Sequence, residues 1–209
     1  LNTVLQHVVA CRGTGSAPFV RVLKNDADII KPVLDLAPAG IVVPRVNSAA
    51  EARAAVAACR YPPTGIRGFG PRRGVRFGAT SQPAYLAEVA SEPILAIQVE
   101  HIEAVENIDE ILAVEGVDII CIGPNDLSGS LGKLGQIDDP DVVAAIEGVA
   151  DKVSRTRHIL GTSTFYSPET FARWMDLGVR WINLNVDFAN LYRASHEVLQ
   201  AARDNSEST

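Results

Sequence analysis

Polar side chains that suit chemistry on a small organic anion follow three short apolar runs of the sequence. Arg21 lies near the end of one run, Gln98 and Glu100 close another, and Asp126 follows a third. Carboxylate oxygens are the ligands that Mg²⁺ and Mn²⁺ prefer, and a cation held by two acids would stabilise the enolate of a chelated 2-oxo acid. Arg21 would add charge-assisted hydrogen bonds. The prediction depends on convergence, because each acid alone would be explained by a loop or helix-cap hydrogen bond.

These side chains converge only if the runs that carry them are strands of one parallel sheet. The strand candidates are dense in Val and Ile and mostly apolar on both faces, as parallel strands covered by helices are. They are Phe19–Leu23, Gly40–Val46, Ile94–Glu100, Asp118–Ile122, Ile159–Ser163 and Trp181–Asn185. Ligands of such folds bind at the carboxyl ends of the strands, and the polar residues lie at those ends.

Helical stretches alternate with the strand candidates. They are Leu1–Cys11, Asp28–Ala37, Ser48–Cys59, Ala104–Val114, Asp141–Val153 and Pro168–Leu177. Repeated strand–helix units predict a parallel α/β architecture with right-handed crossovers. Tyr61–Tyr85 is a long loop rich in Gly, Pro and Arg, and the polar tail Arg203–Thr209 is predicted to be frayed.

The number of strands leaves the closure of the sheet open. Six strands satisfy an open, doubly wound sheet, whereas a closed barrel of this type needs eight. The chain does not begin with Met and opens within an apparent helix. We therefore expect residues to be missing in front of Leu1, and two further strands there would close a barrel.

Composition narrows the class of protein. Of the 209 residues, 47% are hydrophobic and 21% charged, which is typical of a globular domain. The net charge of −6 argues against a nucleic-acid ligand, and no apolar run reaches the length that spans a membrane. Three scattered cysteines without a CxxC pair indicate reduced thiols in a cytoplasmic protein.

Competing motifs fit their contexts poorly. Gly13-Thr14-Gly15 precedes a strand candidate instead of following one, and Gly132-Lys133 lacks the rest of a phosphate-binding loop. No lysine ends a strand candidate, which disfavours a Schiff-base aldolase.

Three runs taken together resemble the HpcH/HpaI aldolase/citrate lyase family. They are Tyr61–Gly68, Gln98–Glu100 and Ile122–Ser128, and the similarity extends from Leu1 to about Leu191. The most similar branch is the class II pyruvate aldolases, such as 4-hydroxy-2-oxoheptanedioate and 2-dehydro-3-deoxyglucarate aldolases. The resemblance implies a (β/α)8 TIM barrel, so we expect residues 1–209 to be a single, N-terminally incomplete barrel domain.

The resemblance also implies roles for individual residues. Glu100 and Asp126 correspond to the ligands of a divalent metal, which is Mg²⁺, Mn²⁺ or Co²⁺. Arg21 corresponds to the arginine that binds pyruvate and stabilises its enolate, and Gln98 lines the same pocket. A turn contacts the substrate through its backbone, and it consists of Gly123, Pro124 and Asn125.

A catalytic histidine of the family has no counterpart in the sequence. It would fall just before Leu1, and Asp35 matches the acid that supports it, although a polar residue at a helix end explains Asp35 equally well. The family forms homo-oligomers, so we expect a hexamer or trimer and take the Arg-rich segment Arg67–Arg76 as a candidate subunit contact.

The resulting prediction is an aldolase that forms or cleaves 4-hydroxy-2-oxo acids from a 2-oxo acid and an aldehyde. One alternative is a citrate-lyase-like enzyme that acts on an acyl-CoA ester. Another is a catalytically inactive barrel that binds a metal or an oxo acid, which only the absent histidine favours. The sequence does not reveal the aldehyde, because specificity in barrels lies in variable loops.

Overall fold

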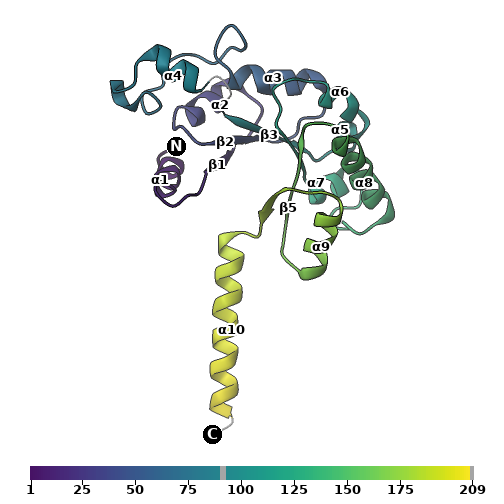
Figure 1. Ribbon diagram of the computed structural model, residues 1–209. Helices are drawn as coiled ribbons and strands as arrows, with labels where there is room; N and C mark the ends of the chain where they lie inside the picture. The colour runs from purple at the N-terminus through teal and green to yellow at the C-terminus, as the bar shows by residue number, and fades with distance from the viewer. Residues whose placement is uncertain (90–92, 208–209) are drawn as a thin grey trace.

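The structure is a computed structural model that describes residues 1–89 and 93–207. Its centre is a six-stranded, all-parallel sheet in which each strand pairs with the next along the chain (Figure 1). The strands are β1 (Phe19–Arg21), β2 (Gly40–Val43), β3 (Ile94–Val99), β4 (Ile119–Ile122), β5 (Ile159–Thr164) and β6 (Trp181–Leu184). Residues that follow successive strands therefore meet along one edge of the sheet.

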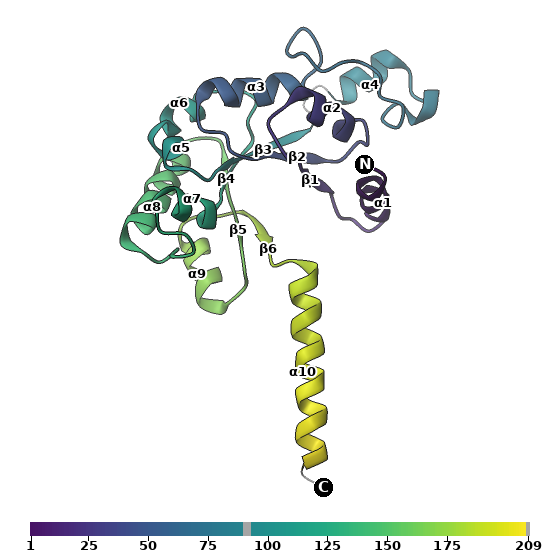
Figure 2. The same cartoon turned by 180° about the vertical axis from the view of Figure 1, so that it is seen from behind.

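In chain order the α-helices of the described residues are α1 (Asn2–Ala10), α2 (Ala27–Leu34), α3 (Ala49–Cys59), α4 (Gln82–Glu88), α5 (Ile102–Glu106), α6 (Ile108–Leu112), α7 (Pro124–Ser130), α8 (Pro140–Ser154), α9 (Pro168–Asp176) and α10 (Asp187–Glu207). Helices such as α3, α6 and α8 cover the outer face of the sheet (Figure 2). Strand residues such as Ile97 and Ile120 share one buried core with helix residues such as Ile30 and Ile146. Burial of each such side chain contributes roughly 1.5–3 kcal/mol, so this core fixes the strands that carry the site.

The opposite face, called the inner face here, is concave. Phe19 and Trp181 lie on the two edge strands, yet their ring centroids are 5.6 Å apart. Six flat strands would span about 24 Å at the usual spacing, so the sheet must curl strongly. Glycines make room for the two rings, because a Cβ at Gly40 would lie 2.2 Å from the Phe19 ring and one at Gly161 2.9 Å from the Trp181 ring.

The alternating parallel architecture expected from the sequence is confirmed, but the closed eight-stranded barrel is not formed by the described residues. Their six strands make a curled half-barrel. The helix expected over Ala104–Val114 is two short helices, because Asn107 leaves the helical conformation with φ −91° and ψ 10° between α5 and α6. Its side chain instead donates to the carbonyl oxygen of Asn47 at 2.9 Å.

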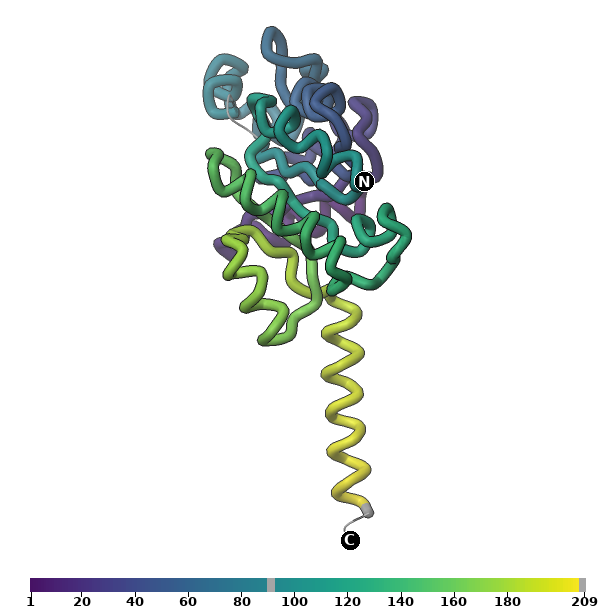
Figure 3. The backbone as a smooth tube through the Cα atoms, turned by 90° about the vertical axis from the view of Figure 1, so that its right-hand side faces the viewer, coloured from purple at the N-terminus to yellow at the C-terminus, as the bar shows by residue number. Residues whose placement is uncertain are grey.

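The last helix, α10, projects away from the rest of the chain (Figure 3). None of residues 187–206 is buried, and Phe188, Leu191, Tyr192 and Val198 are each at least 70% exposed. The tail expected to fray is helical as far as Glu207, so that prediction was wrong there, while residues 208–209 lie outside the described part. Among the helices described, α10 included, none has the length and apolar character needed to cross a membrane.

Candidate active site

Arg21 and Gln98 meet on the inner face. Arg21 lies two residues after Phe19 in β1, and Gln98 lies two residues after Ala96 in β3. Phe19 and Ala96 pack on the inner face, and every second residue of a strand points to the same face. Nε of Arg21 donates to Oε1 of Gln98 at 2.6 Å, across the intervening strand β2. The hydrogen bond fixes the plane of the guanidinium group while Arg21 remains exposed.

Glu100 continues the inner-face row one residue beyond β3. It is only 3% exposed, and its Oε1 accepts a hydrogen bond of 2.9 Å from the backbone N–H of Arg45. Burial raises the pKa of the Glu100 carboxyl group, and the negative charge of Asp126 raises it further, whereas the Arg45 N–H and the charges of Arg21 and Arg45 act in the opposite direction. The Glu100 carboxylate thus interacts with one acid and two arginines.

Gly123 allows the turn from β4 into α7 to pass close to Glu100. A Cβ at this position would lie 2.8 Å from both Cβ and Oε2 of Glu100, which is shorter than a van der Waals contact. Pro124 then begins α7, and Asp126 lies in its first turn. Any side chain at position 123 would therefore displace the carboxylate that the turn approaches.

Glu100 and Asp126 line one cavity of about 500 Å³. Other residues of its wall are Arg45, Asn47, His101, Glu103, Gly129 and Ser130. Neither Glu100 nor Asp126 forms an ion pair with a basic side chain in the described part of the chain. Two acids that share a cavity and form no ion pair are a donor set that fits a hard divalent cation.

The acid pair would supply only part of a coordination shell. Within residues 1–89 and 93–207, no group of three or more His, Cys, Asp or Glu side chains is arranged to hold a metal. Magnesium and similar cations retain several waters or bind substrate oxygens when the protein offers few ligands. A site with two carboxylates therefore suits a cation that takes its other ligands from water or from a small chelating acid.

The predicted substrate-binding turn lies between two cavities. Pro124 and Asn125 line a second cavity of about 260 Å³, which is also bordered by residues that follow β5 and β6. Asp126, one residue further along α7, lines the first cavity. The two cavities are thus lined by consecutive residues of one helix, with Asn125 in the second and Asp126 in the first.

Asp35 does not join these residues. It caps the C-terminus of α2, about 12 Å along the helix from the end that follows β1. Its Oδ2 accepts from Nζ of Lys31 at 2.6 Å, and its Oδ1 accepts from Nη2 of Arg67 at 3.2 Å. This placement matches a polar residue at a helix end, and support of a catalytic histidine by Asp35 stays a prediction.

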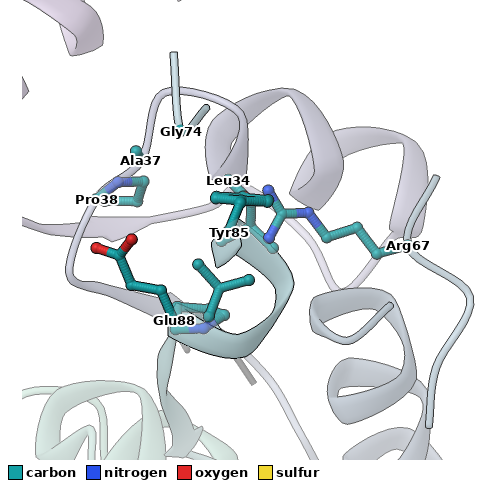
Figure 4. Close-up of a pocket in the computed structure, with 9 residues that line it drawn as sticks. Leu34, Ala37, Pro38, Arg67, Gly74, Tyr85 and Glu88 are labelled. Atoms are coloured by element: carbon teal, nitrogen blue, oxygen red, sulfur yellow. The ribbon is translucent and has the colours of Figure 1, made fainter. Parts of the chain in front are cut away.

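Arg67 lies beside a small cavity of about 110 Å³ (Figure 4). Its side chain is 4% exposed, and its guanidinium carbon lies 4.5 Å from the ring centroid of Tyr61. In the segment Arg67–Arg76, expected to contact another subunit, Arg67 is therefore committed to the interior, whereas Arg72 and Arg76 are exposed. A subunit contact through this segment stays a prediction for those two residues.

Sequence reasoning missed Arg45 and Asn47, which line the cavity of the two acids. The expected strand Gly40–Val46 ran too far, so Arg45 was taken as part of it. The strand ends at Val43, and Pro44 has no N–H to donate to a neighbouring strand. Applied to the true end of β2, the rule that selected Arg21 would also have selected Arg45.

The curled parallel sheet with two acids beyond its strand ends defines an α/β half-barrel with an acid-lined cavity at one edge. Comparison with known proteins adds the family. The chain belongs to the HpcH/HpaI aldolase/citrate lyase family, whose sequence profile matches residues 1–194. The resemblance noted from the three sequence runs is thereby confirmed.

Several relatives of the chain are named as aldolases. It is 41% identical over 196 residues to the pyruvate aldolase of Rhizobium etli, a match that covers 92% of this chain and 75% of the relative. It is 37% identical over 208 residues to the 4-hydroxy-2-oxo-heptane-1,7-dioate aldolase of Shigella flexneri, covering 100% of this chain and 77% of that protein. The crystal structure of an HpcH/HpaI aldolase from Desulfitobacterium hafniense superimposes with a TM-score of 0.89 at 29% identity, covering 97% of this chain and 78% of that one.

Proposed function

We propose that the protein is a class II, divalent-metal-dependent aldolase that forms or cleaves 4-hydroxy-2-oxo acids through the enolate of pyruvate. The observation that carries the proposal is the cavity shared by Glu100 and Asp126, neither of which forms an ion pair with a basic side chain of the described residues. The exposed guanidinium of Arg21, anchored by Gln98 on the same face, supports it. The aldolase activities of the relatives support it independently.

Each residue of the proposed site has a separate task. Glu100 and Asp126 would hold Mg²⁺, Mn²⁺ or Co²⁺, which acts as a Lewis acid on a keto oxygen when bound. The N–H of Arg45 orients Glu100 by donating to Oε1, so Oε2 is the carboxylate oxygen left to bind the cation. Arg21 binds the 2-oxo acid through charge-assisted hydrogen bonds, and Gln98 holds the guanidinium in place.

The turn at Gly123, Pro124 and Asn125 orients the substrate through its backbone in this proposal. The position of the turn between the two cavities supports that role. The base that removes a C3 proton is assigned to none of residues 1–209. Histidine suits this task because its ordinary pKa lies near neutrality.

Cleavage of a 4-hydroxy-2-oxo acid by the full-length protein tests the proposal. We expect activity with Mg²⁺, Mn²⁺ or Co²⁺ and its loss in a chelator, restored by added metal. Glu100→Ala and Asp126→Ala should each reduce kcat/KM by roughly 10³-fold or more, because each removes a charged oxygen ligand. Glu147→Ala is the matched control, since this acid is exposed on α8, away from both cavities. Full activity in metal-free buffer, or in either site variant, would contradict the proposal.

We further propose that the chain, as a single barrel-type domain of a cytoplasmic protein, assembles into a homo-oligomer, either a trimer or a hexamer. The exposed apolar side chains of α10 support this, since Phe188, Leu191 and Tyr192 would otherwise all face water. Light scattering should give three or six times the protomer mass. A monomer at micromolar concentration would contradict the assembly while leaving the proposed chemistry intact.

A further inference from the structure

The second cavity, which we call the acceptor pocket, differs in chemistry from the cavity of the acid pair. Five of its lining residues carry a neutral hydroxyl or amide group, and they are Asn125, Ser163, Thr164, Thr170 and Asn185. The remaining lining residues are apolar, with Phe165 among them. Among the described residues that line this pocket, none is charged.

The acceptor pocket lies within reach of a small molecule bound at Glu100. Val99 pairs with Ile122, and Ile122 pairs with Thr162, so Glu100, Gly123 and Ser163 follow in one row across three strands. Two strand spacings amount to about 10 Å. A small acid held at Glu100 would therefore lie about 10 Å from Ser163 on the same face of the sheet, within reach of an aldehyde that occupies the pocket.

The polar groups of the pocket are held in place by local hydrogen bonds. Oδ1 of Asn185 accepts from the N–H of Tyr166 at 2.8 Å, which assigns the amide orientation and leaves the Nδ2 group as a donor. Asn185 has a φ of 61°, a left-handed conformation that Asn tolerates better than most residues. Oγ of Ser163 accepts from Nδ2 of Asn183 at 3.2 Å, so its own O–H is available to donate. The pocket thus offers fixed neutral donors.

The charged residues around the acceptor pocket disfavour an anion. Every residue that directly adjoins a lining residue in the sequence and carries a charge is an acid, and these are Asp126, Asp138, Glu169 and Asp187. A nearby cation, Arg173, already pairs with Asp138 at 2.6 Å. A carboxylate that entered the pocket would lose hydration without gaining a cationic partner.

We propose that the acceptor pocket binds the hydroxylated chain of an uncharged aldehyde, so that the enzyme prefers small hydroxyaldehydes to aldehydes that carry a carboxylate. The inference rests on the proposed function and names its acceptor class. In the step, the C3–H bond of pyruvate breaks, a bond forms from C3 to the aldehyde carbon, and the aldehyde oxygen takes up a proton. The relative from Shigella flexneri is named for a dicarboxylic substrate, and the pocket argues against the same preference here.

Competition between two aldehydes tests the inference with the full-length protein, Mg²⁺ and pyruvate. We expect kcat/KM for glyceraldehyde to exceed that for succinic semialdehyde by about 10-fold or more, the range in which one mismatched group discriminates. The substitution Thr170→Lys places a cation at the pocket and should lower this ratio by about 5-fold or more. Glu147→Lys, on the exposed surface of α8, is the charge control and should leave the ratio unchanged.

The ratio of two substrates does not depend on the fraction of folded enzyme, so a partly unfolded variant still gives a valid answer. A preference for succinic semialdehyde, or a ratio that Thr170→Lys does not move, would overturn the inference. Exchange of the pyruvate methyl protons in D₂O needs no aldehyde, so it separates the two proposals. Exchange with the wrong aldehyde preference overturns the acceptor class alone, whereas absence of metal-dependent exchange overturns the proposed function and the acceptor class with it.

Discussion

Two polar clusters of the molecule contain similar residue types but differ in how their charges are balanced. The inner-face cluster consists of Arg21, Gln98, Glu100 and Asp126, and its two acids share a cavity without a paired basic side chain in the described residues. In the Asp35 cluster, by contrast, Lys31 and Arg67 both pair with one carboxylate. The acids of the inner-face cluster are therefore available to bind a cation, whereas the carboxylate of Asp35 already has two cationic partners.

The balance of charge has different physical consequences at the two places. Burial raises the pKa of the Glu100 carboxyl group, which means that the ionised carboxylate is disfavoured there. A cation bound beside it would stabilise the ionised form. Arg67 is buried between Asp35 and the Tyr61 ring, so its charge is compensated within the chain. We therefore expect the first cluster to act mainly on activity and the second mainly on stability.

The largest expected effect comes from Glu100→Gln. This change keeps the shape of the side chain but removes the negative charge, so kcat/KM should fall by roughly 10³-fold. The free energy of unfolding of the metal-free protein should stay the same or rise, because a buried carboxylate beside Asp126 is removed. Steady-state kinetics and urea unfolding measure the two quantities. A large loss of stability with little loss of activity would reverse the assignment of this cluster.

Arg67→Met should produce the opposite pattern and a somewhat smaller effect. The variant leaves Asp35 with only Lys31 as a partner and removes the stacking on Tyr61, so unfolding should become easier by about 2–4 kcal/mol. Catalysis at saturating metal should change less than threefold. Urea unfolding at pH 7 measures the loss, with Arg53→Met on the exposed side of α3 as the matched control. Equal destabilisation by the two variants would show that the buried pair contributes nothing special.

The sequence was enough to predict much of the framework that holds the inner-face cluster. The β3 candidate Ile94–Glu100 and the β4 candidate Asp118–Ile122 match the observed strands to within one residue at each end. Runs of Val and Ile between helical stretches leave few alternatives, because burial on both faces demands them. The polar residues beyond those runs then had to share one edge of the sheet.

Other features depend on contacts between distant segments, which the sequence pattern does not encode. The pairing of Asp35 with Arg67 joins residues 32 positions apart and gives the candidate catalytic acid a buried arginine as its partner. Helix α10 was not predicted from the sequence. Its apolar residues Phe188 and Leu191 are exposed and do not pack on the core, and its end from Arg203 is polar. The curvature of the sheet could not be predicted either, because the number of strands does not determine whether a parallel sheet is flat or curled.

The smallest expected effect concerns order within the inner-face cluster. Arg21→Lys keeps the positive charge but loses the fixed plane of the guanidinium group, and Gln98→Met removes the oxygen that fixes it. Each change should lower kcat/KM by about 10-fold, mainly through weaker orientation of the 2-oxo acid.

A double-mutant cycle decides whether the hydrogen bond itself is responsible. If Gln98 acts only by positioning Arg21, the double variant should be about 10- to 20-fold slower than the parent, since the second change removes an interaction already lost. A product of the two single effects, about 100-fold, would mean that Gln98 contacts the substrate independently. The cluster would then be two separate binding groups on one face, and its preorganisation would have to come from Glu100 and the Arg45 N–H instead.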